Sequence, residues 1–547
     1  MTAGKRVGGL PSDYATIVRD IGSLVGLQST LMVVSASLAA VFGEWYVGAA
    51  FLLSAGITVV AGAAARRRFA AAPEPKMKHG MVIAAGGWFA TACFGALPFF
   101  LSAHLVPASV MATYVPAGAA YDASSLGVFA NPLHALFESM SGWTGSGLTM
   151  ARHEPSLPRA VQWWRSFIQW VGGVGVIVLT VAILARPGSG SYALYRSEAR
   201  SERIHPSVVS TVRTVWKIVV GYTLLAAVLL FVAIRTSSYG TTLSLAETAW
   251  QALNHGMTGL TTGGFSVTDN SIATYDSPLV EGVLLPVMVL GAIAFPVHYA
   301  VLSDHDLGEL YGDLQTRWLF ILLAVGVVLL GVQNVLTANA LPAAFDGDWA
   351  ALGLTGAQTD ALRDSTFQLV SALSCTGFQS APIGEWGDGA KLITSASMVI
   401  GGAAGSTVGG IKIVRAYTIG RGAIWQFSRA FLPSSAVAVA RIDGRVLDRG
   451  EMEREFGEAA IVSLLWILFL VAGSVVLVNL AGPEFGYADA LFEVASAQGN
   501  VGLSTGIAGP DMHPVAETMF LFNMWIGRLE IIPVLALVRS VVYGLGH

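Results

Sequence analysis

The chain carries little charge for its length. Of its 547 residues, 12% are Asp, Glu, Lys or Arg and 54% are hydrophobic, whereas about 25% of an ordinary soluble domain is charged. So little charge argues against an ordinary water-soluble fold and indicates lipid as the solvent. The formal net charge of −4 says little about partners, and no nucleic-acid partner is expected.

Cysteine and the common catalytic motifs are also scarce or missing. Cys93 and Cys375 are the two cysteines, and neither has a CxxC or CxxH spacing, which argues against a disulfide framework or a zinc site. The chain contains no HExxH or P-loop sequence, and its histidines show no metal-ligand spacing, so an enzyme is not expected. A Rossmann fingerprint is absent as well.

Long apolar runs are what the sequence has instead. Several approach the roughly 20 residues that cross a bilayer as a helix, and we expect an all-α polytopic membrane protein with about ten crossings. Most of the 31 lysines and arginines fall on the side of both chain ends. The positive-inside rule makes that side cytoplasmic, in a multi-pass protein of the cell (inner) membrane. The opposite loops are acidic, which either concentrates cations there or is the usual polarity of solvated loops.

Four stretches of the sequence align on one column, formed by Phe137, Asn254, Phe367 and Phe492. Four residues later every copy has a hydroxyl side chain, at Ser141, Thr258, Ser371 and Ser496. Ten residues after the column every copy has glycine, at Gly147, Gly264, Gly377 and Gly502. Self-similarity at such spacing indicates an internal repeat.

Each aligned stretch offers only about a dozen residues of helical character, too few to span the hydrocarbon. It is predicted to be a re-entrant half-helix, so the unit is span, pore half-helix, filter loop, span. Four units that enter from one side can surround one pore as parallel repeats. The predicted divisions are a two-span N-terminal extension (1–75) and pore repeats at 76–200, 201–310, 311–450 and 451–547, the third with an interrupted second span.

The loops after the half-helices are the predicted ion site. Irregular backbone at membrane depth requires surrounding protein or a wet cavity, and rings of backbone carbonyls replace the hydration shell of potassium. Half-helix dipoles would also favour a cation there. The alternative is that these small residues only let helices pack closely. The predicted potassium-binding filter consists of Thr144, Gly145, Ser146, Gly147, Thr261, Thr262, Gly263, Gly264, Ser374, Cys375, Thr376, Gly377, Gly499, Asn500, Val501 and Gly502.

The motifs around these loops resemble those of the Trk/Ktr/HKT superfamily of potassium transporters, over nearly the whole chain. Its four filters are similar to FESMSGWTGSGLT, TTGGFS, SCTGF and FEVASAQGNVGLSTG of this sequence. The two extra N-terminal spans are TrkH-like, whereas the fourth filter is KtrB-like, which leaves the subfamily open. In HKT relatives a serine at the position of Gly147 accompanies sodium transport, so glycine here implies potassium.

The resemblance also implies partners. It suggests a homodimer of pore subunits joined to a cytoplasmic, nucleotide-binding regulatory subunit of the TrkA or KtrA type. Any nucleotide would then sit on that partner, and this chain would hold no cofactor besides the potassium it carries. The implied function is potassium uptake, with sodium-permeable or cation-coupled transport as the alternative. A secondary transporter with inverted repeats fits less well, because four parallel repeats are expected.

A glycine-rich interruption and one arginine are the predicted gate. Five glycines in ten residues disfavour a helix by about 1 kcal/mol each, and similar loops in the family suggest an unwound segment below the filter; the alternative is a GxxxG packing face. Arg528, a charge inside the last crossing, is predicted to face the pore or to form a structural ion pair. Arg165 and Lys412 are expected to reach the membrane interface. The gate residues are Gly401, Gly402, Gly405, Ser406, Thr407, Gly409, Gly410 and Arg528.

Overall fold

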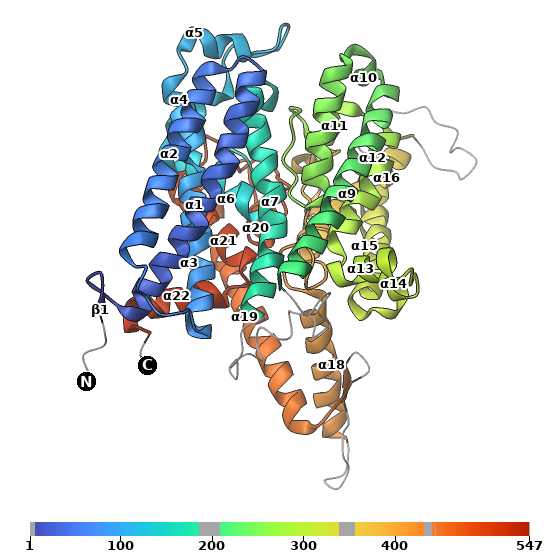
Figure 1. The fold of residues 1–547 in the computed structure, drawn as a ribbon. Coiled ribbons are helices and arrows are strands. Elements are labelled where there is room, and N and C mark those ends of the chain that lie inside the picture. Colours follow the sequence, from blue (N-terminus) through green and yellow to red (C-terminus); the bar gives the residue numbers. More distant parts are fainter. Residues whose placement is uncertain (1–5, 185–207, 338–355, 432–439, 443–444, 546–547) are drawn as a thin grey trace.

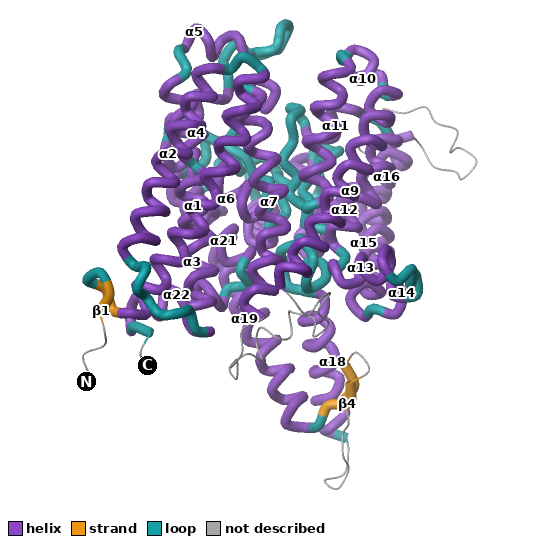
Figure 2. The backbone as a smooth tube through the Cα atoms, in the orientation of Figure 1, coloured by secondary structure: helices purple, strands orange, loops and turns teal. Residues whose placement is uncertain are grey.

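The computed structural model describes residues 6–184, 208–337, 356–431, 440–442 and 445–545. Helices form most of this structure, and loops connect them (Figure 2). Its strands make two short antiparallel pairs, β1 (Arg6–Val7) with β2 (Leu10–Pro11) and β3 (Ala440–Ile442) with β4 (Arg445–Leu447). The all-helical fold class predicted for a polytopic membrane protein is confirmed.

Two long helices, α1 (Ser12–Val41) and α2 (Trp45–Arg68), pack side by side ahead of the repeats (Figure 1). Their backbones approach closely at glycine. A Cβ added to Gly62 would lie 2.6 Å from the carbonyl oxygen of Gly22 and 2.8 Å from the amide nitrogen of Gly26. This is the small-residue contact by which membrane helices associate without help from water.

The order span, pore helix, loop, span then recurs four times. The first repeat contains α3 (Met77–Gly95), α4 (Leu97–Leu105), α5 (Ala108–Met111), the pore helix α6 (Pro132–Thr144) and α7 (Arg159–Leu184). The second contains α9 (Val208–Thr236), α10 (Ser238–Thr242), the pore helix α11 (Leu245–Leu260), α12 (Pro278–Ala292) and α13 (Phe295–Ser303).

The third and fourth repeats follow the same order. The third contains α14 (Glu309–Gly312), α15 (Leu314–Thr337), the pore helix α16 (Gly356–Leu373), α17 (Asp388–Val399) and α18 (Ile413–Ala430). The fourth contains α19 (Arg449–Val478), the pore helix α20 (Tyr487–Gly499), α21 (Pro514–Arg528) and α22 (Ile532–Tyr543). Short 3₁₀ helices lie in the loops, at Ala112–Tyr114, Ser125–Ala130, Glu154–Ser156, Ser271–Tyr275 and Ile383–Glu385.

Six helices are long and apolar enough to cross a membrane, and two bent pairs raise the number to eight in the described part of the chain. The bends are 108° between α12 and α13 and 113° between α21 and α22. α7 and the interrupted pair α17 and α18 occupy the places of the other two expected crossings.

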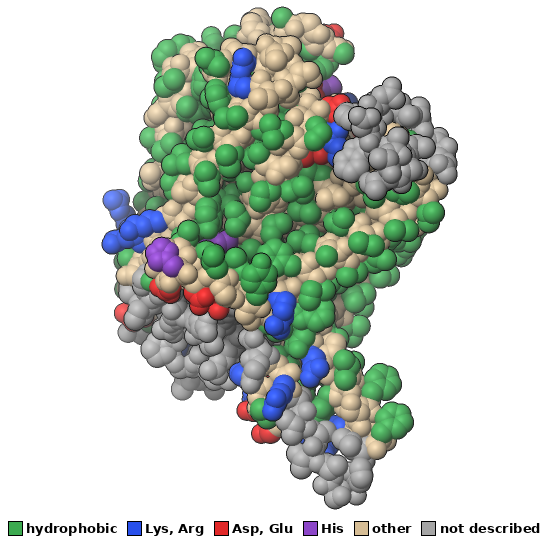
Figure 3. All heavy atoms as spheres, turned by 90° about the vertical axis from the view of Figure 1, so that its right-hand side faces the viewer, with side chains coloured by type: hydrophobic (Ala, Val, Ile, Leu, Met, Phe, Trp, Pro, Cys, Tyr) green, Lys and Arg blue, Asp and Glu red, His purple; other side chains and the backbone are tan. Residues whose placement is uncertain are grey.

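The outer surface of the helices is apolar. Leu225, Val228 and Val232 of α9 are 54%, 62% and 55% exposed, and hydrophobic side chains spread over the body in Figure 3. Exposed apolar surface on this scale marks an interface rather than a face towards water. The protein is therefore a multi-pass membrane protein.

One end of the molecule carries an extension. The described chain begins and ends at the same end of the bundle, and α18 and the first part of α19 project beyond the other helices there (Figure 1). The projecting helix α19 begins with a capping box at this end, because Asp448 accepts from the amide of Glu451 and the Glu451 carboxylate accepts from the amide of Asp448. We call the end of the bundle where the described chain begins and ends the terminal end, and the opposite end the loop-rich end.

Candidate functional site

Each predicted filter segment adopts the left-handed backbone conformation twice. The second residue has φ between +51° and +69°, in Gly145, Thr262, Cys375 and Asn500. The fourth residue is a glycine with φ between +75° and +105°, in Gly147, Gly264, Gly377 and Gly502. L side chains rarely adopt this conformation, so four different sequences are held in one shape.

The pore helices hold these turns through backbone amides. The amide of the third filter residue donates, at 2.8–2.9 Å, to the carbonyl of the hydroxyl residue five positions earlier, in Ser146, Gly263, Thr376 and Val501. The amide of the second residue donates, at 3.1–3.3 Å, to the carbonyl three positions earlier, in Gly145, Thr262, Cys375 and Asn500. The pattern is the same in all four repeats.

The predicted column of hydroxyl residues fastens three of the four loops by its side chains. Thr258 and Ser371 each donate at 2.8 Å to the carbonyl of the residue after the filter glycine, Phe265 and Phe378. Ser496 accepts from the amide of Gly502 at 3.0 Å. The hydroxyl of Ser141 is buried and has no hydrogen-bond partner among the described residues.

The four filter glycines form a closed ring. A Cβ added to Gly147 would overlap the carbonyl oxygen of Gly263. The same addition at Gly264 would overlap the carbonyl oxygen of Thr376, and at Gly377 that of Val501. At Gly502 it would lie 2.6 Å from the carbonyl oxygen of Ser146. Each repeat thus abuts the next in chain order, and the fourth returns to the first.

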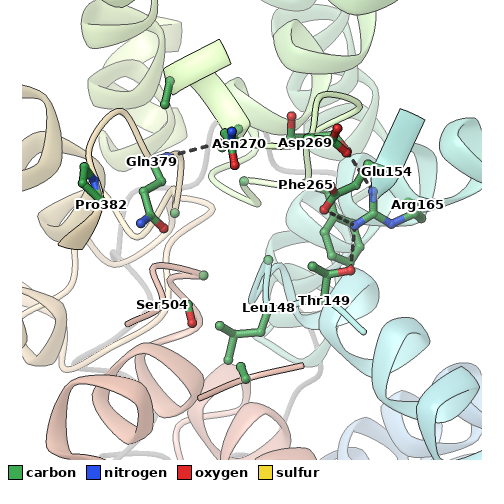
Figure 4. Close-up of a pocket in the computed structure, with 18 of the residues that line it drawn as sticks. Leu148, Thr149, Glu154, Arg165, Phe265, Asp269, Asn270, Gln379, Pro382 and Ser504 are labelled. Atoms are coloured by element: carbon green, nitrogen blue, oxygen red, sulfur yellow. Dashed lines mark hydrogen bonds and ion pairs between the residues drawn. The ribbon is translucent and has the colours of Figure 1, made fainter. Parts of the chain in front are cut away.

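The same four glycines line one cavity of about 440 Å³, on the loop-rich side of the ring. Figure 4 shows Arg165, Glu154 and Asp269 on one side of this cavity and Gln379 and Pro382 on the other. We call this cavity the vestibule. The structure therefore brings together residues from four stretches that are more than a hundred positions apart in sequence.

Acidic side chains from two loops face the vestibule. Glu154 is 7% exposed, and its Oε1 lies 3.8 Å from Nη2 of Arg165. Burial raises the pKa of Glu154 to about 8, and the charge of Arg165 opposes that shift. Burial also raises the pKa of Asp269, whose Oδ1 lies 3.8 Å from Nδ1 of His153.

On the other side of the ring, the glycine-rich segment is a loop between α17 and α18, and it is not helical. It fills the bend between α12 and α13. The amides of Ala403 and Thr407 donate to the last carbonyls of α12, and the amide of Phe295 donates to the carbonyl of Gly405 at 3.1 Å. Gln315 of α15 accepts from the amide of Ala404 at 2.7 Å.

The loop touches the filter directly. The hydroxyls of Thr407 and Thr262 are 2.9 Å apart. A Cβ added to Gly409 would overlap the carbonyl oxygen of Gly499 and lie 2.8 Å from Oδ1 of Asn500. The two ends of the loop also contact each other, since a Cβ on Gly401 would overlap the carbonyl oxygen of Gly409.

The remaining predicted gate residues differ in their surroundings. A Cβ on Gly402 would lie 2.9 Å from the carbonyl oxygen of Ala292, whereas one on Gly405 would have open space around it. Ser406 donates to the carbonyl of Ala403 at 2.5 Å. Gly410 has φ +68°, and a Cβ there would lie 2.8 Å from the amide nitrogen of Gly401.

Arg528 lies at the end of α21 and is 4% exposed. Its Nη1 donates to the carbonyl of Thr407 at 2.6 Å, and its Nη2 donates to the carbonyls of Gly172 and Gly173 in α7 at 3.1 and 3.2 Å. Among the described residues its recorded partners are backbone carbonyls rather than a carboxylate. Glu530 instead pairs with Arg415, at 3.1 Å.

The expectation that Arg165 and Lys412 reach the membrane interface is wrong. They are 1% and 6% exposed. Arg165 forms an ion pair with Glu138 at 2.6 Å, and Nζ of Lys412 donates to the carbonyl of Val408 at 2.5 Å. Partners inside the protein outcompete snorkelling, because each cation finds preformed acceptors close by.

Sequence reasoning missed two groups of residues at this site. Breaks in α12–α13 and α21–α22 were not predicted, although Pro296 and Pro533 at the second helical positions are a usual start signal. Gln169 of α7 was also missed. Its Nε2 donates to the carbonyl of Gly263 at 2.5 Å, and its Oε1 accepts from the amide of Phe265 at 3.0 Å. A polar side chain well inside an apolar span was the available signal.

Known proteins resemble this chain over almost its whole length. An uncharacterized cation transporter of Methanocaldococcus jannaschii is 30% identical over 86% of this chain and 84% of its own. Proteins named Trk system potassium uptake protein TrkH from Halomonas elongata and Escherichia coli K12 are 28% and 26% identical, over 95% and 96% of this chain and 97% and 98% of their own.

The fold has a solved counterpart. The crystal structure of the potassium transporter TrkH from Vibrio parahaemolyticus matches 97% of this chain and 99% of its own, with a TM-score of 0.76 at 23% identity. The family model TrkH, described as cation transport protein, matches residues 79–542, which include all four pore helices and the whole ring. The chain therefore belongs to the TrkH family of cation transport proteins.

Proposed function

We propose that this protein takes up potassium through a channel-like pore whose selectivity filter is the ring of four segments ending at Gly147, Gly264, Gly377 and Gly502. The observation that carries the proposal is that these four glycines, far apart in sequence, close one ring and line one cavity. The Halomonas and Escherichia relatives are named potassium uptake proteins, which favours potassium as the cation.

The backbone of the ring suits a dehydrated cation. The pore helices hold the amides of the second and third filter residues, so the carbonyl oxygens are the polar backbone groups that can face an ion. The carbonyl of Gly263 also accepts from Gln169. Each pore helix also ends at its filter, where the negative end of its dipole lowers the energy of a positive charge. The same amide pattern in all four repeats supports a coordination shell contributed from four sides.

The loop from Gly401 to Gly410 is the proposed gate. It lies against the second and fourth filters on the side away from the vestibule, and Arg528 adds a buried cation at the same depth. A cation that leaves the filter meets both the loop backbone and this charge. The obstruction has to move before ions pass at a high rate.

We place the terminal end in the cytoplasm and the vestibule outside the cell. Arg66, Arg67 and Arg68 end α2 at the terminal end, and basic side chains gather at that end in Figure 3. Several other basic residues used for this prediction, such as Arg196 and Arg200, lie outside the described residues. The proposed location is the cell inner membrane, with both termini cytoplasmic.

The proposed assembly is a homodimer bound to a cytoplasmic nucleotide-binding subunit of the TrkA or KtrA type. This chain would hold potassium as its cargo and no cofactor. The projecting part of α18 and α19 lies at the proposed cytoplasmic end (Figure 1), where such a subunit could reach the helix that follows the loop. Sodium permeation or coupling to another cation is the competing function.

The test is cation flux into liposomes that contain the purified protein, with potassium and sodium compared with and without an imposed proton gradient. Gly147→Ser should lower the preference for potassium roughly tenfold or more, because its Cβ overlaps the carbonyl oxygen of Gly263 and displaces one filter ligand. Gly118→Ser is the matched control, since Gly118 has φ +80° and open space around it. Unchanged relative permeabilities in Gly147→Ser would contradict the filter; flux that needs the proton gradient would favour coupled transport.

A further inference from the structure

The pore-helix residue just after the aligned column has the same task in all four repeats. Its side chain reaches forward to a residue eleven or twelve positions later, on the chain that leaves the filter towards the vestibule. Glu138 accepts from the hydroxyl of Thr149 at 3.0 Å, and Glu493 from that of Ser504 at 2.6 Å. In the other two repeats the bonded pairs are His255 with Ser266 at 2.9 Å and Gln368 with Ser380 at 3.1 Å.

Only the first of these four supports is an ion pair with a basic side chain, within the part of the chain that the structure describes. Nε of Arg165, from α7, donates to Oε1 of Glu138 at 2.6 Å. The two side chains are 1% and 0% exposed. Glu138 also accepts from the amide of Met150 at 2.8 Å. The carboxylate therefore has several donors, and the guanidinium keeps two more nitrogens for other acceptors.

Those two nitrogens join the first repeat to the second. Nη2 of Arg165 donates to the hydroxyl of Thr149 at 3.0 Å, just after the first filter. Nη1 donates to the carbonyl of Ser266 at 2.8 Å, just after the second filter. The guanidinium carbon also lies 4.2 Å from the centre of the Phe265 ring. One planar cation thus holds the chain segments that follow two neighbouring filters at a fixed separation.

We propose that Arg165, supported by Glu138, is a positioning residue that sets the spacing between the first and second filter segments and so contributes to ion preference. The inference rests on the proposed filter. Backbone oxygens select an ion by their number and spacing, and a rigid link between two of the four segments limits how far they can close around a smaller ion. The vestibule side of the ring is then held more firmly between repeats one and two than elsewhere.

The variants must separate positioning from folding. Removing Arg165 alone leaves the buried carboxyl of Glu138 without its ion-pair partner, which is expected to destabilise the fold. The double variant Arg165→Gln/Glu138→Gln removes both charges and keeps side chains that can hydrogen-bond. Arg165→Lys keeps the charge next to Glu138, but a single ammonium cannot reproduce the fork that reaches Thr149 and Ser266 together.

Lys391 provides the matched control. Its Nζ lies 2.6 Å from Oδ1 of Asp489, both side chains are at most 10% exposed, and the pair joins α17 to the pore helix α20. It is a buried ion pair between two repeats, like that of Arg165. In the described structure, however, neither of its side chains forms a hydrogen bond with a filter residue. The double variant Lys391→Gln/Asp489→Asn should lower thermal stability and leave ion preference unchanged.

The experiment is the potassium-to-sodium permeability ratio in liposomes at equal amounts of inserted protein. We expect the ratio to fall roughly three- to tenfold in Arg165→Gln/Glu138→Gln and less in Arg165→Lys. A wild-type ratio in the double variant, or in Arg165→Lys where the double variant does not insert, would overturn the proposal. Gly147→Ser is run alongside: if it changes the ratio while the Arg165 variants do not, only this inference fails, and if it does not, the filter itself is wrong.

Discussion

The two sides of the ring are built on opposite plans. On the vestibule side, four pore helices with different sequences present the same two left-handed residues and the same amide bonds. On the other side, the second spans of the four repeats do not share one form. α7 is continuous as far as it is described, α12–α13 and α21–α22 bend by 108° and 113°, and a loop separates α17 from α18.

This difference follows from what each side has to do under the proposed function. A cation stripped of water needs ligands from all directions at once, so any repeat that departed from the common shape would leave a gap. A gate needs one part that moves while the others stay in place. A loop supplied by a single repeat meets that requirement, and three further copies would fill the space that it needs.

Gly377→Ala is the strongest way to break the symmetric side. Its Cβ would overlap the carbonyl oxygen of Val501 and lie 2.8 Å from the Cα of Gly502, and alanine at φ +80° is strained as well. We expect the free energy of unfolding to fall by at least about 2 kcal/mol, because the left-handed backbone alone costs about 1–2 kcal/mol and the overlap adds to this cost. Potassium-selective flux should be lost as well. Thermal unfolding in detergent and liposome flux would measure the two effects.

Gly118→Ala carries the same backbone strain at φ +80° without a steric neighbour. It should lose about 1–2 kcal/mol and conduct normally. If the two variants unfold at the same temperature and conduct alike, the ring contacts do not matter, and the symmetric side is less tightly packed than the structure indicates.

Arg528→Gln tests the asymmetric side. The substitution removes a buried cation and the donors that hold the carbonyls of Thr407, Gly172 and Gly173. A charge beside the ion path opposes a cation by about 1 to 4 kcal/mol at 4 Å, so flux should rise roughly fivefold or more, since each 1.36 kcal/mol is tenfold. Arg528→Lys should keep most of the barrier.

The comparison is made at equal protein density, with Arg429→Gln as control. Arg429 pairs with Glu453 on the projecting helices, at 3.0 Å and with both side chains partly exposed, so its loss should leave flux unchanged. If Arg528→Gln conducts no faster than Arg528→Lys, the electrostatic barrier is wrong, and Arg528 serves only to hold the loop in place.

How far the sequence could predict each side follows the same division. The glycines and hydroxyl residues of the filter repeat at matched positions, so the ring could be predicted from self-similarity alone. Thr262, Cys375 and Asn500 share a left-handed conformation with Gly145, yet no residue type marks them in common. Their conformation is held by backbone amide bonds to the pore helix, which leave no mark on the residue type.

Residues on the asymmetric side have no copies to compare. The loop was found because five glycines stand out, but the partners of Arg528 are carbonyls from α7 and from the loop, more than a hundred residues away in sequence. Burial of Arg165 and Lys412 could not be predicted either. Their acceptors, Glu138 and the carbonyl of Val408, are near in sequence, but only the folded structure shows that they face these cations.

The smallest expected effect is on the pH dependence of potassium influx, through the charge of Glu154 in the vestibule. Its raised pKa, about 8, means that the carboxyl is mostly neutral below that pH and gains a negative charge as pH rises through it. The nearby charged groups are Arg165, Glu138, Asp269 and His153. A new negative charge about 10 Å from an approaching cation in water contributes about 0.4 kcal/mol, or about twofold in local concentration. Potassium influx at subsaturating concentration should therefore rise about twofold between pH 7 and pH 9 on the vestibule side, and Glu154→Gln should remove that rise while leaving influx at pH 7 nearly unchanged.

Asp511, exposed and paired with Arg152 at 2.7 Å, provides the matched control, because Asp511→Asn removes an acidic group near the same end without touching the vestibule. An equal rise with pH in wild type and Glu154→Gln would show that another group titrates and that Glu154 does not control the charge of the vestibule.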